Sequence, residues 1–317
     1  MMTIPLSSGD AIPAFGLGTW KSDPEVVYDA VVEAIKVGYR HIDCAAIYCN
    51  EEEIGRALKD VISQGVVTRD DLWVTSKLWN NSHAPDDVSP ALEKTLHDLQ
   101  LDYLDLYLIR WPVHQKKEFF LPEGDDIFVA YDEIPIIDTW GVMEGLVREG
   151  KLKTIGVSNF NIPKLQKLLD TAEIRPVNNQ VEGHPYLQQR ELLEFCESEG
   201  VAVTAYSPMG SPDRPAQMKA CDEKSLLENE VIVSVAERNG ISAGQVLIAW
   251  AIQRGTAVIP KSANPSRIIQ NIEASRMTLS DGDMAAIAAL DNGYRYVKGD
   301  FWERPDSPYT MDWLWNE

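Results

Sequence analysis

Eight short apolar segments alternate with longer amphipathic segments along the chain, and this order predicts a closed (β/α)8 (TIM) barrel. Regular alternation of strands and helices implies a parallel sheet, because each helix returns the chain to the edge where the next strand begins. Eight such units within 317 residues fit a closed barrel better than an open, doubly wound sheet. A single domain over residues 1–317 is therefore expected, since barrels commonly reach this length.

The expected strands are runs rich in β-branched and aromatic residues. They are Phe15–Gly18, His41–Cys44, Leu72–Ser76, Leu104–Ile109, Thr154–Val157, Val177–Val181, Ala202–Ala205 and Ala257–Ile259. The expected helices show apolar residues at helical spacing. They are Glu25–Val37, Glu51–Ser63, Pro85–Leu99, Asp138–Glu149, Ile162–Ala172, Gln188–Gly200, Leu226–Asn239 with Ala243–Arg254, and Ser266–Ala274.

Residues typical of helix caps support these boundaries. Asp138 and Ser242 stand where N-cap residues belong, since their side-chain oxygens can accept bonds from free backbone N–H groups. Glycines follow several of the helices, as C-cap residues do; they are Gly38, Gly65, Gly150, Gly200, Gly240 and Gly255. The predicted helices therefore carry stop signals as well as periodicity.

Segments outside the alternation have their own predicted roles. Ile4–Leu6 and Ala11–Ile12, separated by Ser8-Gly9-Asp10, are expected to form an N-terminal β-hairpin. Residues 113–137 and 208–225 are long connections, and such connections in a compact domain are usually functional lids or disordered. The tail, residues 294–317, is rich in Trp and Tyr, so it is expected to be ordered and to form part of a substrate pocket.

The composition is that of a soluble globular protein, with 44% apolar and 25% charged residues. A formal net charge of −20 argues against nucleic acid or an anionic membrane surface as a partner. An anionic cofactor must then be held by a local basic site. The N-terminus lacks the pattern of an export signal, and no apolar run approaches about 20 residues, so a cytoplasmic location is expected.

The four cysteines, Cys44, Cys49, Cys196 and Cys221, show no C-x-x-C spacing. A metal site using the neighbouring pair Cys44 and Cys49 is the weaker reading, because no second cluster accompanies them. Reduced, mostly buried thiols and no metal are the expectation.

Polar residues stand at or just past the ends of most predicted strands. They are Asp43, Lys77, Arg110, Ser158 with Asn159, Gln180, Tyr206 and Lys261. In a closed barrel the carboxyl ends of all the strands meet on one rim, where barrel enzymes have their active sites. The spacing therefore predicts one common site on that rim.

Asp43, Tyr48 and Lys77 form a plausible proton-donating set. A lysine ammonium held by a carboxylate beside a tyrosine favours the phenolate, so the tyrosine can give or take a proton near neutral pH. Carbonyl reduction and alcohol oxidation both need such a group. The alternative readings are a buried ion pair without a chemical role and a tyrosine that only packs.

Lys261-Ser262, followed by Arg267 and Asn271, places two cations at a strand end and at the start of the next helix. That arrangement suits a phosphate monoester such as the 2′-phosphate of NADP, and the alternative is a solvated helix start. There is no G-x-G-x-x-G: Gly16-x-Gly18-Thr19-Trp20 lacks the third glycine, which argues against a Rossmann site.

Six motifs in unbroken order between Leu6 and Asn292 resemble the aldo-keto reductases. They are Gly16–Trp20, the Asp43–Tyr48 run, Val74–Lys77, Ile155–Phe160, Ala205–Pro208 and Ile259–Ser262. The resemblance implies a barrel closed below by the hairpin and a monomer that reduces small carbonyl substrates with NADPH, with Tyr48 as the acid tuned by Asp43 and Lys77. In that family the residues matching Lys261, Ser262, Arg267 and Asn271 clamp NADP.

The resemblance also assigns binding residues one by one. The cofactor residues it implies are Thr19, Trp20, Asp43, Ser158, Asn159, Gln180, Tyr206, Ser207, Met209, Ser211, Lys261, Ser262, Arg267, Gln270 and Asn271. The substrate residues are Trp20, Tyr48, Trp79, Arg110 and Trp111, with Phe119, Phe120 and Trp302 as further candidates. A pocket of this composition is apolar with one polar focus.

One position departs from the family pattern. The strand end that reads apolar-Ile-His-Trp-Pro in the family reads Leu108-Ile109-Arg110-Trp111-Pro112 here, so an arginine, natural or introduced, replaces the substrate-orienting histidine. An always-charged guanidinium can stabilise an alkoxide, fill the pocket, or turn away to pair with an acid such as Asp43. Reduced or altered turnover is expected. A sensor or scaffold that holds NADPH with weakened catalysis, and a double-bond reductase, are the rival functions.

Overall fold

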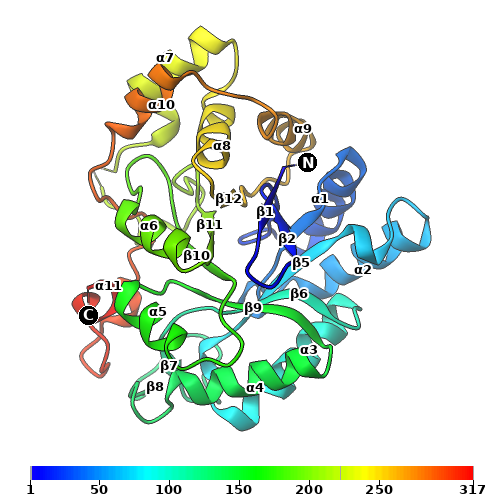
Figure 1. Ribbon diagram of the computed structural model, residues 1–317, viewed down its shortest axis with the longest axis vertical. Coiled ribbons are helices and arrows are strands. Elements are labelled where there is room, and N and C mark those ends of the chain that lie inside the picture. Colours follow the sequence, from blue (N-terminus) through cyan, green and yellow to red (C-terminus); the bar gives the residue numbers. More distant parts are fainter. Residues whose placement is uncertain (1, 222, 317) are drawn as a thin grey trace.

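The computed structural model describes residues 2–221 and 223–316, so the outermost residues of the predicted domain and tail, Met1 and Glu317, lie outside it, as does Asp222. Eight parallel strands form one sheet in the order β12-β11-β10-β9-β6-β5-β4-β3, and the helices surround it (Figure 1). The predicted (β/α)8 barrel is confirmed.

The barrel strands match the predicted segments to within a few residues. They are β3 (Leu17–Gly18), β4 (His41–Asp43), β5 (Trp73–Leu78), β6 (Leu104–Ile109), β9 (Leu152–Ser158), β10 (Asn178–Glu182), β11 (Ala202–Tyr206) and β12 (Ala257–Val258). Their registers align the polar strand ends, since Gly18 pairs with Asp43, Gln180 with Ser158 and Glu182 with Tyr206. The ends of the strands therefore meet on one rim.

The sheet closes between the first and last strands. Phe15 bridges to Val258 and Gly18 to Lys261, and the Gly18 N–H donates to the Pro260 carbonyl at 3.1 Å. A side chain at Gly18 has no room here, because an added Cβ would lie 2.5 Å from the Ile259 carbonyl oxygen. The glycine thus allows the backbones to approach closely enough to join the barrel.

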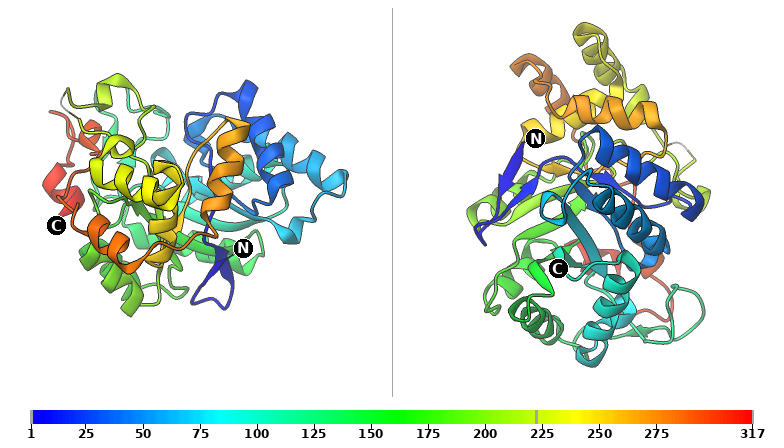
Figure 2. Two further views of the ribbon diagram at one scale, coloured as in Figure 1. Left: turned by 90° about the horizontal axis from the view of Figure 1, so that it is seen from above. Right: turned by 90° about the vertical axis from the view of Figure 1, so that its right-hand side faces the viewer.

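Helices lie outside the strands on all sides of the barrel (Figures 1 and 2). They are α1 (Pro24–Val37), α2 (Glu51–Ser63), α3 (Pro85–Leu99), α4 (Ile136–Arg148), α5 (Ile162–Leu169), α6 (Arg190–Ser198), α7 (Glu230–Asn239), α8 (Ala243–Gln253), α9 (Pro265–Ala274), α10 (Asp281–Ala288) and α11 (Met311–Trp315). Ser242 is the N-cap of α8, as predicted. It also forms a capping box, in which the side chains of Ser242 and Gln245 each accept a hydrogen bond from the backbone N–H of the other residue.

The predicted N-terminal hairpin is present as β1 (Thr3–Pro5) and β2 (Ala11–Pro13), which pair antiparallel. Its residue Ile12 and the nearby Leu6 are buried in a cluster with Trp73, Leu106 and Leu108, from the barrel strands. The hairpin lies in front of the strands in Figure 1 and projects at the lower edge of the left view of Figure 2. It covers the end of the barrel where the strands begin, so the opposite rim is left for the site.

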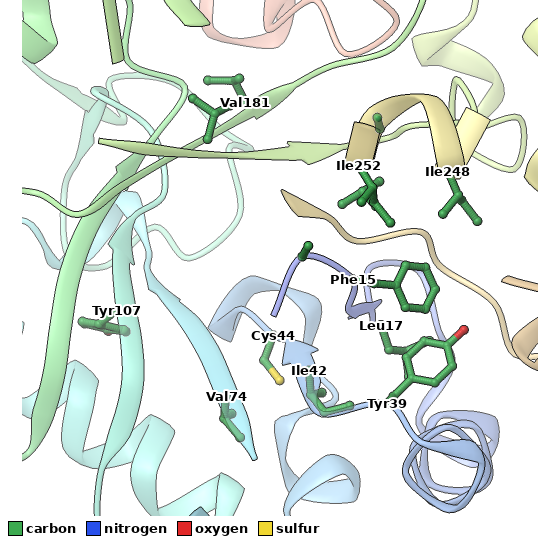
Figure 3. Close-up of a cluster of buried hydrophobic side chains, with 14 of the residues drawn as sticks. Phe15, Leu17, Tyr39, Ile42, Cys44, Val74, Tyr107, Val181, Ile248 and Ile252 are labelled. Atoms are coloured by element: carbon green, nitrogen blue, oxygen red, sulfur yellow. The ribbon is translucent and has the colours of Figure 1, made fainter. Parts of the chain in front are cut away.

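The largest apolar core fills the space between the strands and the surrounding helices. Figure 3 shows Phe15, Leu17 and Tyr39 facing Ile248 and Ile252 of α8. The Tyr39 hydroxyl donates to the Ile268 carbonyl at 2.8 Å, so this buried tyrosine satisfies its polar atom at the helix layer. This packing holds β3, β4 and α9 in fixed relation.

Several boundaries differ from the predictions for local reasons. Asp138 is not an N-cap: α4 begins at Ile136, because Pro135 fixes an extended entry and leaves Asp138 in the first turn. Helix α6 begins only at Arg190, since Gln189 adopts a left-handed conformation with φ +50°. The predicted helix over residues 226–239 is interrupted by Asn229, whose side chain caps α7 after a short 3₁₀ turn.

Some elements have no counterpart in the predictions. The connection over residues 113–137 contains a small hairpin, β7 (His114–Gln115) with β8 (Phe128–Val129). Ser280 caps α10, and Thr310 caps α11 in the tail. These elements are short and rest on tertiary contacts, which periodicity does not reveal.

Among the described residues no helix has the length and apolar content needed to cross a membrane. All four cysteines are free; Cys44 and Cys196 are buried, but Cys49 and Cys221 are exposed, so the expectation of mostly buried thiols was wrong for two of them. No cluster of histidine, cysteine and acidic side chains suited to a metal occurs within residues 2–221 and 223–316.

Glu51 at the start of α2 is a buried acid whose role the sequence did not indicate. It accepts hydrogen bonds from Ser76 at 2.5 Å and Thr95 at 3.1 Å, and burial raises its pKa from 4.5 to about 7. Between these pH values the unfolded chain loses the proton and the folded chain keeps it, so the free energy of unfolding falls as pH rises. The shift corresponds to about 3 kcal/mol lost across this window.

We therefore expect Glu51→Gln to flatten the decline in unfolding free energy between pH 4.5 and 7 that the wild type shows, because the amide does not ionise. Urea denaturation at several pH values measures this. Glu52→Gln, at the exposed neighbouring position, serves as the control. It removes a charge from the same helix turn but leaves the buried Glu51 in place. Parallel curves for Glu51→Gln and the wild type would contradict the assignment.

Candidate active site

A cavity of about 1200 Å³ opens at the rim where the barrel strands end. Sixteen of the residues predicted for cofactor, substrate or proton transfer line it: Thr19, Trp20, Asp43, Tyr48, Trp79, Arg110, Trp111, Tyr206, Ser207, Met209, Ser211, Lys261, Ser262, Arg267, Gln270 and Asn271. The remaining predicted residues, Lys77, Ser158, Asn159 and Gln180, are fully or almost fully buried and bond to one another or to the lining. The fold thus brings together residues from most of the strands.

Asp43 and Lys77 form an ion pair beneath the cavity. The Lys77 ammonium lies 2.5 Å from one Asp43 oxygen and 2.7 Å from the Cys44 carbonyl, and the Gln180 amide donates to the other Asp43 oxygen at 2.7 Å. Neither charged side chain is appreciably exposed. Both charged groups are hydrogen-bonded to a further partner as well as to each other, which is the condition under which a buried ion pair is tolerated.

Tyr48 lies directly against this pair. It ends a short 3₁₀ turn, Ala46–Tyr48, that follows β4, and its ring centroid is 5.3 Å from the Lys77 ammonium nitrogen. The turn holds because Cys49 adopts a left-handed conformation with φ +54°. A half-buried phenol beside an ammonium, open to the cavity on its other side, is well placed to exchange a proton with a bound molecule.

Amide and hydroxyl groups form a second network behind the cavity wall. The Asn159 amide donates to the Arg110 carbonyl at 3.0 Å, and its oxygen accepts from the Tyr206 hydroxyl at 2.7 Å. Ser158 donates to the Gln180 carbonyl at 2.7 Å, and Asn159 is held at φ +64°. Tyr206 is thereby fixed with its ring lining the cavity.

Gln180 lies two residues before the end of β10 rather than at it, because the strand continues to Glu182. Glu182 is fully buried and accepts from His184 and from the backbone N–H groups of Tyr296 and Val297. Although burial opposes it, these partners lower the pKa of Glu182. A buried carboxylate therefore anchors the start of the C-terminal tail to the barrel, a role that sequence patterns did not suggest.

Arg110 follows β6 directly and lies in the cavity wall with 8% of its surface exposed. Its guanidinium carbon lies 5.3 Å from the Trp111 ring centroid and 5.8 Å from that of Tyr206. It forms no ion pair within the part of the chain that the structure describes, so of the alternatives raised by the sequence the one in which it turns away to pair with Asp43 is excluded. Asp43 is already held by Lys77 and Gln180.

The cavity lining also includes a basic cluster, Lys261 and Arg267. Lys261 follows β12, and Arg267 lies in the first turn of α9, where the Asn264 side chain caps the helix by accepting from the Arg267 N–H at 3.1 Å. Ser262, Gln270 and Asn271 line the same region. The cavity lining as a whole holds four cations, Lys21, Arg110, Lys261 and Arg267, against two acids, Asp43 and Asp213, in a chain of net charge −20.

An ionic strap, formed by Asp213 with Lys21 and Lys261, lies in the cavity lining and was not foreseen from the sequence. Asp213, in the connection after β11, lies 2.5 Å from the Lys21 ammonium and 3.1 Å from that of Lys261. Lys21 also donates to Ser211 at 2.6 Å. Burial opposes it, but the two lysines lower the pKa of Asp213. This contact joins loops that are distant in sequence, so no local motif carries it.

The apolar wall is built from aromatic residues of the loops and the tail. Trp79, Trp111, Tyr206, Val297 and Trp302 belong to one buried cluster, and Phe301 packs against it. Trp302 lines the cavity as suggested, whereas Leu121 takes the place expected for Phe119 and Phe120. Phe120 is exposed, and its carbonyl accepts from the Trp79 indole at 2.6 Å, so its backbone rather than its ring supports the wall.

Comparison with known proteins identifies the family. Residues 14–292 match the model of the aldo/keto reductase family. The chain is 55% identical, over its whole length and 97% of the relative, to an aldo/keto reductase of Synechocystis sp.. It is 48% identical to aldo-keto reductase family 1 member A1 of Mus musculus, over 93% of this chain and 91% of the relative, and to that of Homo sapiens, over 92% and 90%.

This chain is an aldo/keto reductase. The family resemblance drawn from the six motifs is confirmed, and with it an oxidoreductase activity on carbonyl compounds. In barrel enzymes the active site lies at the rim where the strands end.

Proposed function

We propose that this aldo/keto reductase reduces aldehydes and ketones to alcohols with NADPH, with Tyr48 as the proton donor. The observation that carries the proposal is the Tyr48 ring, 5.3 Å from an ammonium that is itself ion-paired, at the wall of the cavity that holds the basic cluster. The proposed proton donor and the cations that would hold the cofactor thus line the same cavity.

The basic cluster and the polar residues beside it have the chemistry needed to bind NADPH. An ammonium, a hydroxyl and a guanidinium at a strand end and helix start form the donor set that a phosphate monoester takes, and this favours NADP over NAD. Lys261, Ser262, Arg267 and Asn271 would hold the 2′-phosphate, with Gln270 beside the adenine. Thr19, Ser207, Met209 and Ser211 would lie along the dinucleotide, which the Lys21–Asp213–Lys261 strap would cover.

Ser158, Asn159 and Gln180 would bond the carboxamide of the nicotinamide, and the Tyr206 ring would stack on its face. The hydrogen bond from Tyr206 to Asn159 supports this role, because it fixes the plane of the ring. When bound, NADPH supplies the hydride. Tyr48 then gives its proton to the carbonyl oxygen, and the Lys77 ammonium stabilises the phenolate that remains, while Asp43 holds Lys77 in place.

The substrate would lie among Trp20, Trp79, Trp111 and the tail residues Val297 and Trp302. These walls are largely apolar, so a medium-sized, fairly apolar aldehyde suits them. We also propose that the chain acts as a single domain and monomer in the cytoplasm; four free cysteines are in keeping with a reducing compartment.

The buried charge of Arg110 favours one rival function. A protein that holds NADPH with weakened catalysis, a sensor or scaffold, would share the basic cluster while lacking the neutral donor at the reacting carbonyl. Both functions require NADPH binding, so turnover separates them. A double-bond reductase would differ again in its product from an enone.

The proposal is tested by following NADPH oxidation with a panel of aldehydes, and by repeating the assay with NADH. We expect measurable reduction of aromatic aldehydes such as benzaldehyde and a clear preference for NADPH. Tight NADPH binding without oxidation by any aldehyde would point to the sensor instead. A saturated ketone recovered from an enone would point to double-bond reduction.

A further inference from the structure

The Arg110 guanidinium is a buried cation without a counter-ion among the described residues. Its Nε and Nη1 atoms are buried and have no hydrogen-bond partner, and the side chain is more than nine-tenths buried in the cavity wall. The rings of Trp111 and Tyr206 lie beside it and offer only weak compensation. An unpaired charge of this kind is costly, so a missing partner is implied.

No carboxylate among residues 2–221 and 223–316 supplies that partner. Both acids that line the cavity are held elsewhere, Asp43 by Lys77 and Gln180, and Asp213 by Lys21 and Lys261. Glu182, the other carboxylate near Tyr206, accepts from His184 and two backbone N–H groups. A molecule bound in the cavity can supply the missing counter-charge, because Arg110 lines that cavity.

The geometry points to a carboxylate next to the reacting carbonyl. The fixed charge of a guanidinium is neutralised by a carboxylate, whereas the carbonyl oxygen of an aldehyde carries no charge and is already served by Tyr48. The Arg110 guanidinium carbon lies 5.8 Å from the Tyr206 ring centroid, and both residues line the same cavity as Tyr48. Lys261 and Arg267, which would hold the phosphate, belong to the segment after β12 and to α9, and Lys261 is already paired with Asp213.

We propose that Arg110 makes this enzyme a reductase of 2-oxo acids, with the aromatic walls holding the remainder of the substrate. The inference rests on the proposed function for its chemical step. In that step the carbonyl carbon gains a hydride from NADPH, the carbonyl oxygen gains a proton from Tyr48, and a 2-hydroxy acid and NADP⁺ are formed. The carboxylate is unchanged and remains on Arg110.

The binding test uses phenylglyoxylate and its amide, 2-oxo-2-phenylacetamide, which differ only in the carboxylate. We expect the wild-type chain loaded with NADP⁺ to bind phenylglyoxylate at least about tenfold more tightly than the amide, measured by calorimetry. Arg110→Gln should abolish this preference. Arg56→Gln, which removes an exposed cation from α2, should retain it.

The kinetic test compares phenylglyoxylate with benzaldehyde. The ratio of their kcat/KM values should fall at least about tenfold in Arg110→Gln and stay unchanged in Arg56→Gln. If the wild type binds the acid and the amide equally tightly, the proposal is overturned by the wild type alone. The proposal can therefore be tested even if the Arg110→Gln variant does not fold. A preference that survives in a folded Arg110→Gln would overturn it as well.

Failure of the proposed function is distinguishable from failure of the carboxylate site. If phenylglyoxylate binds in an Arg110-dependent way but neither it nor benzaldehyde is reduced, the carboxylate site stands and carbonyl reduction is refuted. If benzaldehyde is reduced while the acid binds no better than the amide, carbonyl reduction stands and the carboxylate site is refuted.

Discussion

Tyr48→Phe is expected to lower kcat for benzaldehyde reduction by about 10²–10⁴-fold, the range that a positioned proton donor contributes. The hydroxyl is the only part removed, and the ring that packs 5.3 Å from the Lys77 ammonium remains. Binding of NADPH should change little, because the basic cluster at β12 and α9 is untouched. Steady-state kinetics, with NADPH binding followed by fluorescence, separate the two effects.

Tyr103→Phe provides the matched control. Its hydroxyl bonds the exposed Asp70 far from the cavity lining, so its loss should leave kcat unchanged. A decrease of less than about tenfold for Tyr48→Phe, with cofactor binding intact, would mean that another group or water delivers the proton. The Asp43–Lys77 pair would then have the purely structural role that the sequence also allowed.

The residues at the strand ends could be predicted because a parallel barrel has only one carboxyl rim. Once the alternation of strands and helices was read, Asp43, Tyr206 and Lys261 had to meet there, and each lines the cavity. The helices were predictable where periodicity and caps agreed, as at Ser242. The prediction of Asp138 as an N-cap was wrong, because α4 begins at Ile136, directly after Pro135.

Contacts between distant loops could not be predicted in this way. The strap of Asp213 with Lys21 and Lys261 depends on how two connections fold over the rim, and neither segment has a local pattern that requires it. The anchoring of the tail by Glu182 and the burial of Glu51 likewise depend on packing. An acid in the first turn of a helix is ordinarily solvated, so the sequence pointed the other way.

Arg110 illustrates the same limit at the centre of the site. The sequence identified the position and the departure from the family pattern, but not the direction of the side chain. Pairing with Asp43 was excluded only by the observed bonds from Lys77 and Gln180, which occupy both carboxylate oxygens. The guanidinium therefore keeps its charge facing the cavity.

Arg110→His is expected to raise kcat/KM for benzaldehyde at least about tenfold, a change of about 1.4 kcal/mol in the activation free energy. The guanidinium repels the nicotinamide cation formed by hydride loss, and its bulk narrows the space for the carbonyl group. At an effective dielectric constant near 20, a unit charge about 10 Å away contributes about 1.7 kcal/mol, which is sufficient for this change. A neutral imidazole removes both effects and still donates one hydrogen bond.

Arg110→Gln separates charge from orientation, because the amide is neutral but does not reproduce the imidazole N–H direction. If both variants accelerate benzaldehyde reduction equally, removal of charge is the cause; a larger gain for histidine assigns the remainder to orientation of the carbonyl. The same substitutions should weaken phenylglyoxylate reduction, so the two substrates move in opposite directions. A gain below tenfold for Arg110→His would show that Arg110 does not limit turnover of neutral aldehydes.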